Sequence, residues 1–479
     1  MCISLETGAF PDLLKTSCVV PVHKKGDKSQ LSNYRPISLL SSFSKLFEYC
    51  FLNILLPFLE KNNILCGNQH GFRAGKSTET ALTAFCDEVR QLIDAGECPA
   101  GIFCDLSRAF ECVEHGRLVS KLESYGLRGV AGRWIVSYLL ERRQYVSVKQ
   151  IRSNHLQYYA SDLLNVLTGV PQGSVLGPIL FLLYINDLGK YVDCNGSTVT
   201  LYADDASFLI SGESQMLLKS RCNSALERAA EWFASNSLYL NGNKTTMVQF
   251  HSYQKRINQP LQVGTGQWVV SPSHSVRFLG LYVDENLNFR DHCTHLMSKL
   301  SSAHYQLRSL RNVFTSSQMM PIYFANVESR LRYGIAFWGL SVLAERVFVS
   351  QKKIVRCLAG IHDNTFSCRQ LFREFGLLTL TGIFIFEVSL KIFPQKCSFF
   401  TGSNLHQYNT RRKQNYRVPF RRLLVGQKAT DNIGLRVFNH LPTQITSIAG
   451  LPKFKKALRE FLVARCFYSI GEFFDGDFR

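Results

Sequence analysis

Two adjacent aspartates at the tip of a short apolar hairpin constrain this chain more than any other sequence feature. Segments 198–201 and 206–210 are rich in β-branched and apolar residues, and they flank the tetrapeptide Tyr-Ala-Asp-Asp at 202–205. This pattern predicts two short strands joined by a tight turn. Few cations stand nearby in the sequence, so the carboxylates of Asp204 and Asp205 repel each other unless a divalent ion or a proton intervenes. Hard oxygen ligands of this kind suit Mg²⁺.

A third aspartate, Asp105, ends the apolar segment 101–104 about 100 residues earlier. Two carboxylate-bearing strand ends placed side by side would form a two-metal site for in-line phosphoryl transfer. Each signal alone has a simpler explanation, because paired turn aspartates are usually solvated and Asp105 also suits the N-cap of a following helix. Their joint occurrence favours the site of a nucleic-acid polymerase.

Six sequence blocks in a fixed order carry a family resemblance. They are 33–40 (NYRPISLL), 69–78 (QHGFRAGKST), 105–110 (DLSRAF), 169–178 (GVPQGSVLGP), 202–205 (YADD) and 278–281 (FLGL). Over residues 33–289 the chain resembles the reverse transcriptase of non-LTR (LINE-type) retrotransposons, most similar to the jockey-like and CR1-like groups. The resemblance implies a right-hand fold of fingers, palm and thumb. It also implies RNA-templated DNA synthesis from a DNA primer and dNTPs with two Mg²⁺ ions, Mn²⁺ being an alternative.

The resemblance also implies roles for the residues that do the chemistry. Asp105, Asp204 and Asp205 are expected to hold the metal ions, and Lys244 is expected to protonate the leaving pyrophosphate. Phe110 is expected to pack beneath the sugar and exclude a 2′-hydroxyl, since a rigid ring rejects one extra oxygen atom by overlap. Without the resemblance, Phe110 would be interpreted as a core residue.

Further residues are expected to contact the substrate nucleotide. Gln172 and Gly173 lie in a glycine-flanked block, where the backbone approaches a ligand closely, and the resemblance places them against the incoming nucleotide. Arg35, with Lys24 or Lys25, is expected to clamp the triphosphate, because guanidinium suits bidentate phosphate contacts.

Two segments are expected to contact the nucleic-acid strands. Arg73 is predicted to touch the template backbone. The turn at Phe278, Leu279 and Gly280 is predicted to press on the primer strand without reading its bases.

Hydrophobic periodicity predicts an α+β fold in which helices alternate with antiparallel hairpins. Helical spacing recurs over 41–59, 78–93 and 213–235, while 115–141 reads as two helices broken at glycines. After Asp291 the pattern becomes mostly helical. The helix at 41–59 is expected to bury one broad face, made of Phe43, Leu46, Phe47, Cys50, Phe51, Ile54, Leu55 and Phe58.

A chain of 479 residues exceeds one compact core, so several subdomains are expected. By resemblance, residues 1–100 form the fingers and 101–290 form the palm, with inserted fingers helices at about 115–165. Residues 291–400 would then be a helical thumb, and 401–479 a basic C-terminal region.

The charge of the chain indicates a polyanionic partner. The net charge is +19, and such a surface attracts phosphate backbones in a salt-dependent way. Segment 401–430 contains no acidic residue and seven basic ones, namely Arg411, Arg412, Lys413, Arg417, Arg421, Arg422 and Lys428. A solvated surface stretch and a phosphate-contacting segment explain this composition equally well.

The fifteen cysteines are scattered through apolar runs, and the N-terminal residues lack the apolar stretch of a secretory signal. We therefore expect reduced thiols and an intracellular location, in the nucleus, the cytoplasm or both. No membrane association is expected, because the longest apolar stretch, 175–185, contains Gly and Pro and is too short to span a bilayer.

Two departures from the family pattern leave alternatives open. The family usually has Asp after Ala-Phe, where this chain has Glu111. The chain also begins within the block before the fingers, so it is expected to lack the upstream endonuclease of complete elements. A catalytically silent remnant that only binds RNA is the main alternative. An RNA-dependent RNA polymerase is disfavoured by Phe110, because such enzymes have a small or polar residue at the gate.

Overall fold

The computed structural model describes residues 1–152, 155–192, 196–242, 244–255, 257, 261–265, 268–361, 363, 365–401 and 415–478. The chain divides into two compact units. The first comprises Met1–Ala81, Ala100–Met247 and Leu261–Pro272, and the second comprises Leu82–Pro99, Val248–Pro260 and Ser273–Arg479. Both helices and antiparallel strands are present, so the predicted α+β class is confirmed.

A four-stranded antiparallel sheet carries the hairpin at the centre of the first unit. Its strand order is β11 (Thr246–Gln249), β3 (Ala100–Cys104), β9 (Asp205–Ile210) and β8 (Ser197–Tyr202). Every residue of β3 is buried, and the core combines these strands with α6 (Gly177–Ile185) and α8 (Gln215–Ser235). The predicted strands at 198–201 and 206–210 are therefore confirmed.

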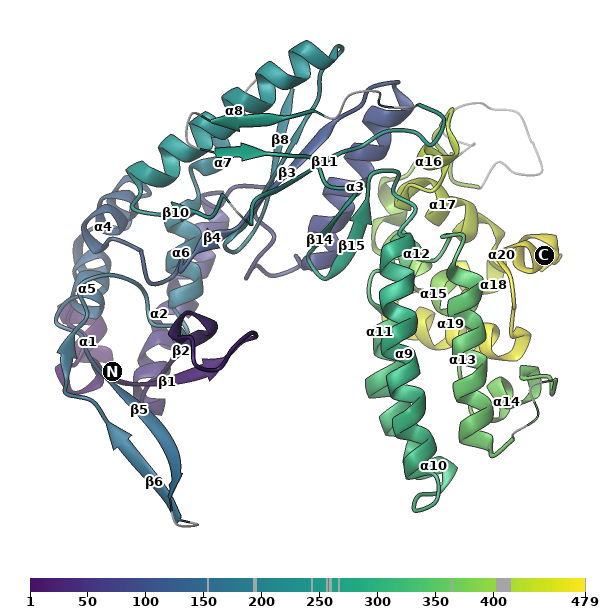
Figure 1. Cartoon of the computed structure of the whole chain (residues 1–479), viewed down its shortest axis with the longest axis horizontal. Coiled ribbons are helices and arrows are strands. Elements are labelled where there is room, and N and C mark those ends of the chain that lie inside the picture. The colour runs from purple at the N-terminus through teal and green to yellow at the C-terminus, as the bar shows by residue number, and fades with distance from the viewer. Residues whose placement is uncertain are drawn as a thin grey trace. The chain divides into compact units, whose positions relative to one another are not determined.

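A second sheet in this unit has the order β2 (Tyr34–Leu39), β1 (Thr16–His23), β5 (Arg143–Arg152) and β6 (His155–Ala160), with β7 (Leu164–Asn165) also paired to β5. Strands β1 and β5 run parallel, whereas the other pairs are antiparallel. Strands β5 and β6 form a hairpin that extends away from the rest of the unit, and all six residues of β6 are exposed (Figure 1).

The prediction of inserted helices over about 115–165 is wrong in its second half. Helices α4 (His115–Ser124) and α5 (Gly129–Leu139) end before residue 143, and strands β5 to β7 follow. Aromatic and β-branched residues are frequent in this part, as at Tyr145 and Val146, and they favour a pleated strand over a helix.

Helix α2 (Ser42–Lys61) is confirmed, and its predicted buried face is confirmed only in part, at Phe51 and Leu55. Its buried residues are Ser44, Glu48, Phe51, Leu55 and Leu59, whereas Phe43, Leu46 and Ile54 are exposed. The Glu48 carboxylate accepts hydrogen bonds from the backbone N–H groups of Val175 (2.7 Å) and Leu176 (3.0 Å). Glu48 is fully buried and satisfies the backbone N–H groups that precede α6. The side of α2 that carries Glu48 therefore faces the protein interior. By length and composition alone α2 would suit a membrane span, but its Glu48–Phe51 face lies in the protein core.

Replacing Glu48 by alanine is expected to lower the free energy of unfolding by about 3 kcal/mol, because two buried N–H donors lose a charged acceptor. Chemical denaturation measures the loss. Glu60→Ala, on an exposed position of the same helix, is the matched control and should change stability by less than about 0.5 kcal/mol. Equal effects of the two substitutions would contradict the assignment.

The second unit is mostly helical, as predicted for the chain after Asp291. Its longer helices are α9 (Arg290–Leu310), α10 (Ser316–Tyr323), α13 (Ala344–Ala359), α15 (Leu380–Ile392), α17 (Thr430–His440) and α19 (Leu451–Arg465). Helices α9 and α13 lie side by side (Figure 1). The predicted turn at 278–280 joins the two strands of a hairpin, β14 (Ser275–Phe278) and β15 (Leu281–Asp284).

Shorter elements complete the fold. In the first unit they are α1 (Cys2–Thr7), α7 (Leu188–Val192), β4 (Leu106–Ser107), β10 (Tyr239–Leu240), β12 (Val263–Thr265) and β13 (Trp268–Val270). In the second they are α11 (Ser329–Arg332), α12 (Ile335–Trp338), α14 (Arg369–Glu374), α16 (Leu424–Gln427), α18 (Thr443–Thr446) and α20 (Ile470–Asp475). Helix α3 (Thr78–Asp94) begins in the first unit and continues into the second.

Candidate active site

The two adjacent aspartates lie at the tip of the β8–β9 hairpin, Asp204 in its two-residue turn and Asp205 at the start of β9. Tyr202 pairs with Asp205, so Ala203 and Asp204 form the turn itself. Ala203 has a φ of +54°, a left-handed conformation that disfavours a residue with a side chain. Its N–H donates to the side-chain oxygen of Gln69 at 3.1 Å, and this bond helps to hold the turn in that conformation.

The segment around Gln69 supports the turn from one side. Backbone hydrogen bonds join His70 N–H to the Leu201 carbonyl (2.8 Å) and Leu201 N–H to the Asn68 carbonyl (2.9 Å). A Cβ atom on Gly71 would lie only 2.4 Å from the backbone nitrogen of Ala203. Glycine is therefore required at 71. Gln69 and Gly71 belong to the block 69–78, but the sequence alone predicted no role for either residue.

Asp105 lies beside the hairpin aspartates. Strand β3 pairs with β9 so that Cys104 faces Ala206, and the same register carries Asp105 to the level of Asp205. The carboxyl of Asp105 is 44% exposed and so remains available to a ligand. The register places Asp105 beside the hairpin aspartates, while convergence of the three carboxylates on metal ions stays a prediction.

Desolvation and mutual repulsion disfavour charge on the hairpin carboxyls. Although Asp205 as a residue remains exposed, desolvation of its carboxyl group raises its pKa to about 6, and the Asp204 and Asp105 carboxylates add to the rise. Burial likewise raises the pKa of Asp204, and the Asp105 carboxylate adds to it. At neutral pH the cluster therefore concentrates negative charge that a cation would stabilise.

Asp205→Asn is expected to stabilise the metal-free protein at neutral pH. The folded-state pKa of about 6 exceeds the ordinary value of 3.8, so wild-type stability falls as the pH rises from about 4 to about 6. The variant lacks this loss. Because solvent screens an exposed group, we expect a gain of at most about 1 kcal/mol at pH 7.5 and none at pH 4.

Thermal unfolding at both pH values in EDTA measures this effect. Asp162→Asn, at an exposed position of the same unit, is the control. A gain of the same size at pH 4 and pH 7.5 would contradict the assigned repulsion.

The donor set fits a hard divalent cation, although the carboxylates do not converge in this conformation. Within the described residues, no group of three His, Cys, Asp or Glu side chains could hold a metal ion as it stands. Instead, the Asp105 carboxylate contacts Lys244 Nζ at 3.3 Å. Both side chains are largely exposed, so this ion pair is weak and easily exchanged for a metal contact.

A cation that directly follows β1, Lys24, and one in β2, Arg35, act on the same carboxylates. Lys24 opposes the rise in pKa of both Asp204 and Asp205, and Arg35 opposes that of Asp204. Lys25 is exposed on the same turn. Of the two lysines predicted to contact the triphosphate, the structure thus favours Lys24.

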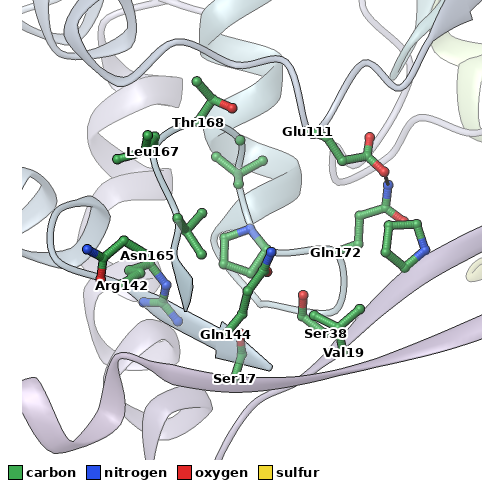
Figure 2. A pocket seen from close by; sticks show the side chains of 15 residues that line it. Ser17, Val19, Ser38, Glu111, Arg142, Gln144, Asn165, Leu167, Thr168 and Gln172 are labelled. Carbon is green, nitrogen blue, oxygen red and sulfur yellow. Dashed lines mark hydrogen bonds between the residues drawn. The ribbon is translucent and has the colours of Figure 1, made fainter. Parts of the chain in front are cut away.

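A cavity of about 350 Å³ lies beside Gln172 (Figure 2). Its walls come from β1, β2 and the loop before α6. The Gln172 amide donates to the Glu111 carboxylate at 2.8 Å, and this pair lies on the opposite side of the cavity from Arg142 and Asn165. Burial raises the pKa of Glu111. Glu111 thus orients the predicted nucleotide-contacting amide, a role that the sequence analysis did not assign to it.

Gly173 and Phe110 are the chain neighbours of two lining residues, Gln172 and Glu111. Gly173 has a φ of +115°, and a Cβ there would lie 2.6 Å from the Ser38 carbonyl oxygen, so glycine is required. The Phe110 carbonyl accepts the N–H of Val170, and its half-buried ring stacks on Phe181 at 4.5 Å. The ring is therefore held against the core with one part still accessible.

The residues predicted to contact the nucleic-acid strands are Arg73 and the turn at 278–280, and none of them lines this cavity. The guanidinium of Arg73 donates to the Cys66 carbonyl at 2.7 Å, so part of it is used to hold its own loop. The hairpin at 278–281 belongs to the second unit. Phe278 is buried there, with its ring 5.2 Å from that of Phe85, so its predicted direct contact with nucleic acid is wrong for the side chain. Leu279 and Gly280 form the accessible tip.

Most of the residues described above lie within the match to a known protein family. The family described as "Reverse transcriptase (RNA-dependent DNA polymerase)" matches residues 22–283, more than half of the chain. The chain belongs to the reverse transcriptase family. The match includes Asp105, Asp204 and Asp205, and the α+β fold is accordingly that of a right-hand polymerase.

Relatives of this reverse transcriptase include proteins of mobile elements. It is 29% identical over 372 residues to the "Probable RNA-directed DNA polymerase from transposon X-element" of Drosophila melanogaster, covering 73% of this chain and 38% of that protein. It is 26% identical over 367 residues to the "RNA-directed DNA polymerase from mobile element jockey" of the same species, covering 74% and 39%. The chain thus spans about two fifths of the length of these curated relatives.

Among solved structures, a telomerase from Candida albicans bound to a telomeric RNA fragment aligns over 74% of this reverse transcriptase and 66% of that chain. The TM-score is 0.43 at 12% identity.

Proposed function

We propose that this chain is an RNA-directed DNA polymerase of a non-LTR retrotransposon, transferring nucleotides from dNTPs to a primer 3′-hydroxyl on an RNA template. The observation that carries the proposal is the register of β3 and β9, which brings Asp105 to the level of the hairpin aspartates. Family membership and the names of the relatives support the same activity.

Asp105, Asp204 and Asp205 would hold two divalent ions, for which we propose Mg²⁺ with Mn²⁺ as a substitute. When bound, such ions neutralise the triphosphate and favour the ionised 3′-hydroxyl. The raised pKa of Asp205 and Asp204 fits this role, because carboxyls that repel one another gain most from a shared cation. The ionic contact of Lys244 with Asp105 would then be released, leaving the ammonium group free to donate a proton to the leaving pyrophosphate.

The other site residues would position the substrates. Arg35 and Lys24, which already interact with the carboxylates, would bind triphosphate oxygens. The Gln172 amide, oriented by Glu111, would contact the incoming nucleotide, and Phe110 would limit the space beneath its sugar. Template contact by Arg73 and primer contact by Leu279 and Gly280 remain part of the proposal.

We also propose that the fingers, palm and thumb follow the boundaries expected from the sequence, except that part of the inserted region consists of strands. An intracellular location is proposed as well. The fourteen cysteines described by the structure are all free thiols, which supports a reducing compartment.

Primer extension tests the function. The purified chain is incubated with poly(rA), an oligo(dT) primer, dTTP and Mg²⁺, and extension products are separated on a denaturing gel. Metal-dependent extension is expected, and EDTA should abolish it. No extension by well-folded protein that still binds poly(rA) would favour the silent remnant that only binds RNA.

A further inference from the structure

A second cavity, lined only by residues of the second unit, lies where the basic C-terminal region meets α3. Its volume is about 580 Å³. Four cationic side chains line it, namely Arg90, Arg290, Arg422 and Lys428, and no lining residue in the described part of the chain is acidic. Arg411, Arg412 and Lys413 of the same basic segment lie outside the described residues. The cavity is therefore suited to an anion.

Arg90 supplies the strongest indication of a ligand. This side chain is only 1% exposed, and one guanidinium nitrogen lies 3.1 Å from the Asp87 carboxylate. The other two nitrogens, Nε and Nη2, have no hydrogen-bond partner among the described residues. The Asp87 carboxylate also accepts hydrogen bonds from the N–H and the hydroxyl of Thr430. Its oxygens are therefore divided between Arg90 and Thr430. A buried guanidinium with unused donors is unfavourable unless a ligand satisfies them.

The nearest carboxylates do not neutralise the remaining cations. Asp94 accepts the backbone N–H groups of Arg422 (3.2 Å) and Leu423 (2.6 Å), and Asp284 accepts that of Arg290 (3.0 Å). Lys428 donates to the Leu340 carbonyl at 3.1 Å, and burial together with the charge of Arg90 lowers its pKa. The positive charge around the cavity is thus only partly balanced within the unit.

Exposed apolar side chains stand beside these cations. Tyr253 is 76% exposed and Leu424 is 74% exposed, and both line the cavity. A free phosphate ion would leave such surfaces unused. A nucleic-acid single strand uses both features, because its phosphates pair with cations while its bases stack on aromatic rings.

We propose that this cavity binds a single-stranded nucleic-acid segment, with one phosphate held by Arg90, Arg422 and Lys428 and a base stacked on Tyr253. None of the three aspartates lines this cavity, and the proposal does not depend on their proposed function. It gives Arg422 and Lys428 of the basic segment 401–430 a phosphate-binding role.

The test uses the full chain without dNTP or divalent metal. A single-stranded RNA carrying 5-iodouridine is crosslinked by light, and the modified peptide is mapped by mass spectrometry. Binding of fluorescein-labelled RNA is measured in parallel at several salt concentrations. The variants are Arg422→Gln and the double variant Arg422→Gln/Lys428→Gln. The control is Lys455→Gln/Lys456→Gln, which removes the same charge from exposed positions of α19.

We expect wild type to crosslink at Tyr253 and the double variant to lose this crosslink. Because each neutralised phosphate adds about 0.7 to the salt slope for single strands, and Arg422 and Lys428 hold the same phosphate, the double variant should lose up to about 0.7 from that slope. The exposed Arg422→Gln change alone should lose about half as much, and the control should match wild type. Retention of the Tyr253 crosslink and of the wild-type slope in the folded double variant would overturn the proposal.

A separate arm tests for a free anion with inorganic pyrophosphate. If pyrophosphate raises the Tm of wild type but not of the double variant, and Tyr253 is not crosslinked, a free anion occupies the cavity and the proposed strand does not.

Discussion

Replacing Asp204 by asparagine is expected to reduce DNA synthesis on an RNA template at least about 1,000-fold. Asp204 lies in the turn between β8 and β9, half-buried and close enough to Asp105 for their charges to interact. Metal ligands of this type contribute several kcal/mol of charge stabilisation in the transition state, and each 1.36 kcal/mol corresponds to a tenfold change in rate. Single-nucleotide extension rates measured at saturating dTTP provide the comparison.

The fold of this variant should survive, because removing one repelled carboxylate relieves the cluster. A thermal melt in EDTA is therefore expected to show an unchanged or raised Tm at neutral pH. If the proposed ions bind here, Mg²⁺ raises the Tm of wild type more than that of the variant. Asp162→Asn, at an exposed position, should retain full activity. Extension within tenfold of wild type by folded Asp204→Asn would exclude this carboxylate from the active site.

Replacing Phe110 by alanine is expected to raise the efficiency of ribonucleotide incorporation relative to deoxyribonucleotide incorporation by about 100-fold. The Phe110 ring stacks on Phe181, which is fully buried, so the wild-type ring has no room to withdraw from a 2′-hydroxyl. Alanine removes the ring and opens that space. An apolar pocket typically rejects a substrate that carries one extra hydroxyl group by about 100-fold. We therefore expect the loss of the Phe110 ring to change the sugar preference by about that factor.

The measurement is the ratio of kcat/KM for UTP to that for dTTP on the same primer and template. Phe110→Val should give an intermediate change, because its side chain is smaller than the ring but still branched. Phe43→Ala removes an exposed ring from α2 and should leave the ratio unchanged. An unchanged sugar preference in both Phe110 variants would remove the gate assignment.

Local sequence patterns predicted the helices and strands whose formation depends on residues close together in the sequence. The hairpin around 202–205 and helices α2, α3 and α8 follow from strand alternation and helical spacing, and all are present. The position of Asp105 beside the hairpin was also predicted, from the joint occurrence of the carboxylate-bearing strand ends and from the family resemblance, and the register of β3 and β9 agrees with it.

Contacts between distant residues explain what the sequence did not reveal. The inward face of α2 is set by Glu48, which bonds to residues about 127 positions away. Likewise Gln69 supports a turn 134 residues further on, and Glu111 orients Gln172 across 61 residues. Phe278 was assigned to the primer contact from its block, but its ring packs on Phe85, a contact that no local pattern encodes.

The hairpin depends on Gly71 as well as on its two aspartates. Even the methyl group of alanine at this position would overlap the peptide backbone of Ala203, so the turn carrying the two aspartates would be displaced. In a saturation-mutagenesis library selected for cDNA synthesis, position 71 should therefore be as intolerant as the acidic positions. Degenerate genomic copies of the element could lose activity at this codon while their acidic triad remains intact, and inspection of the triad alone would then misjudge them as competent.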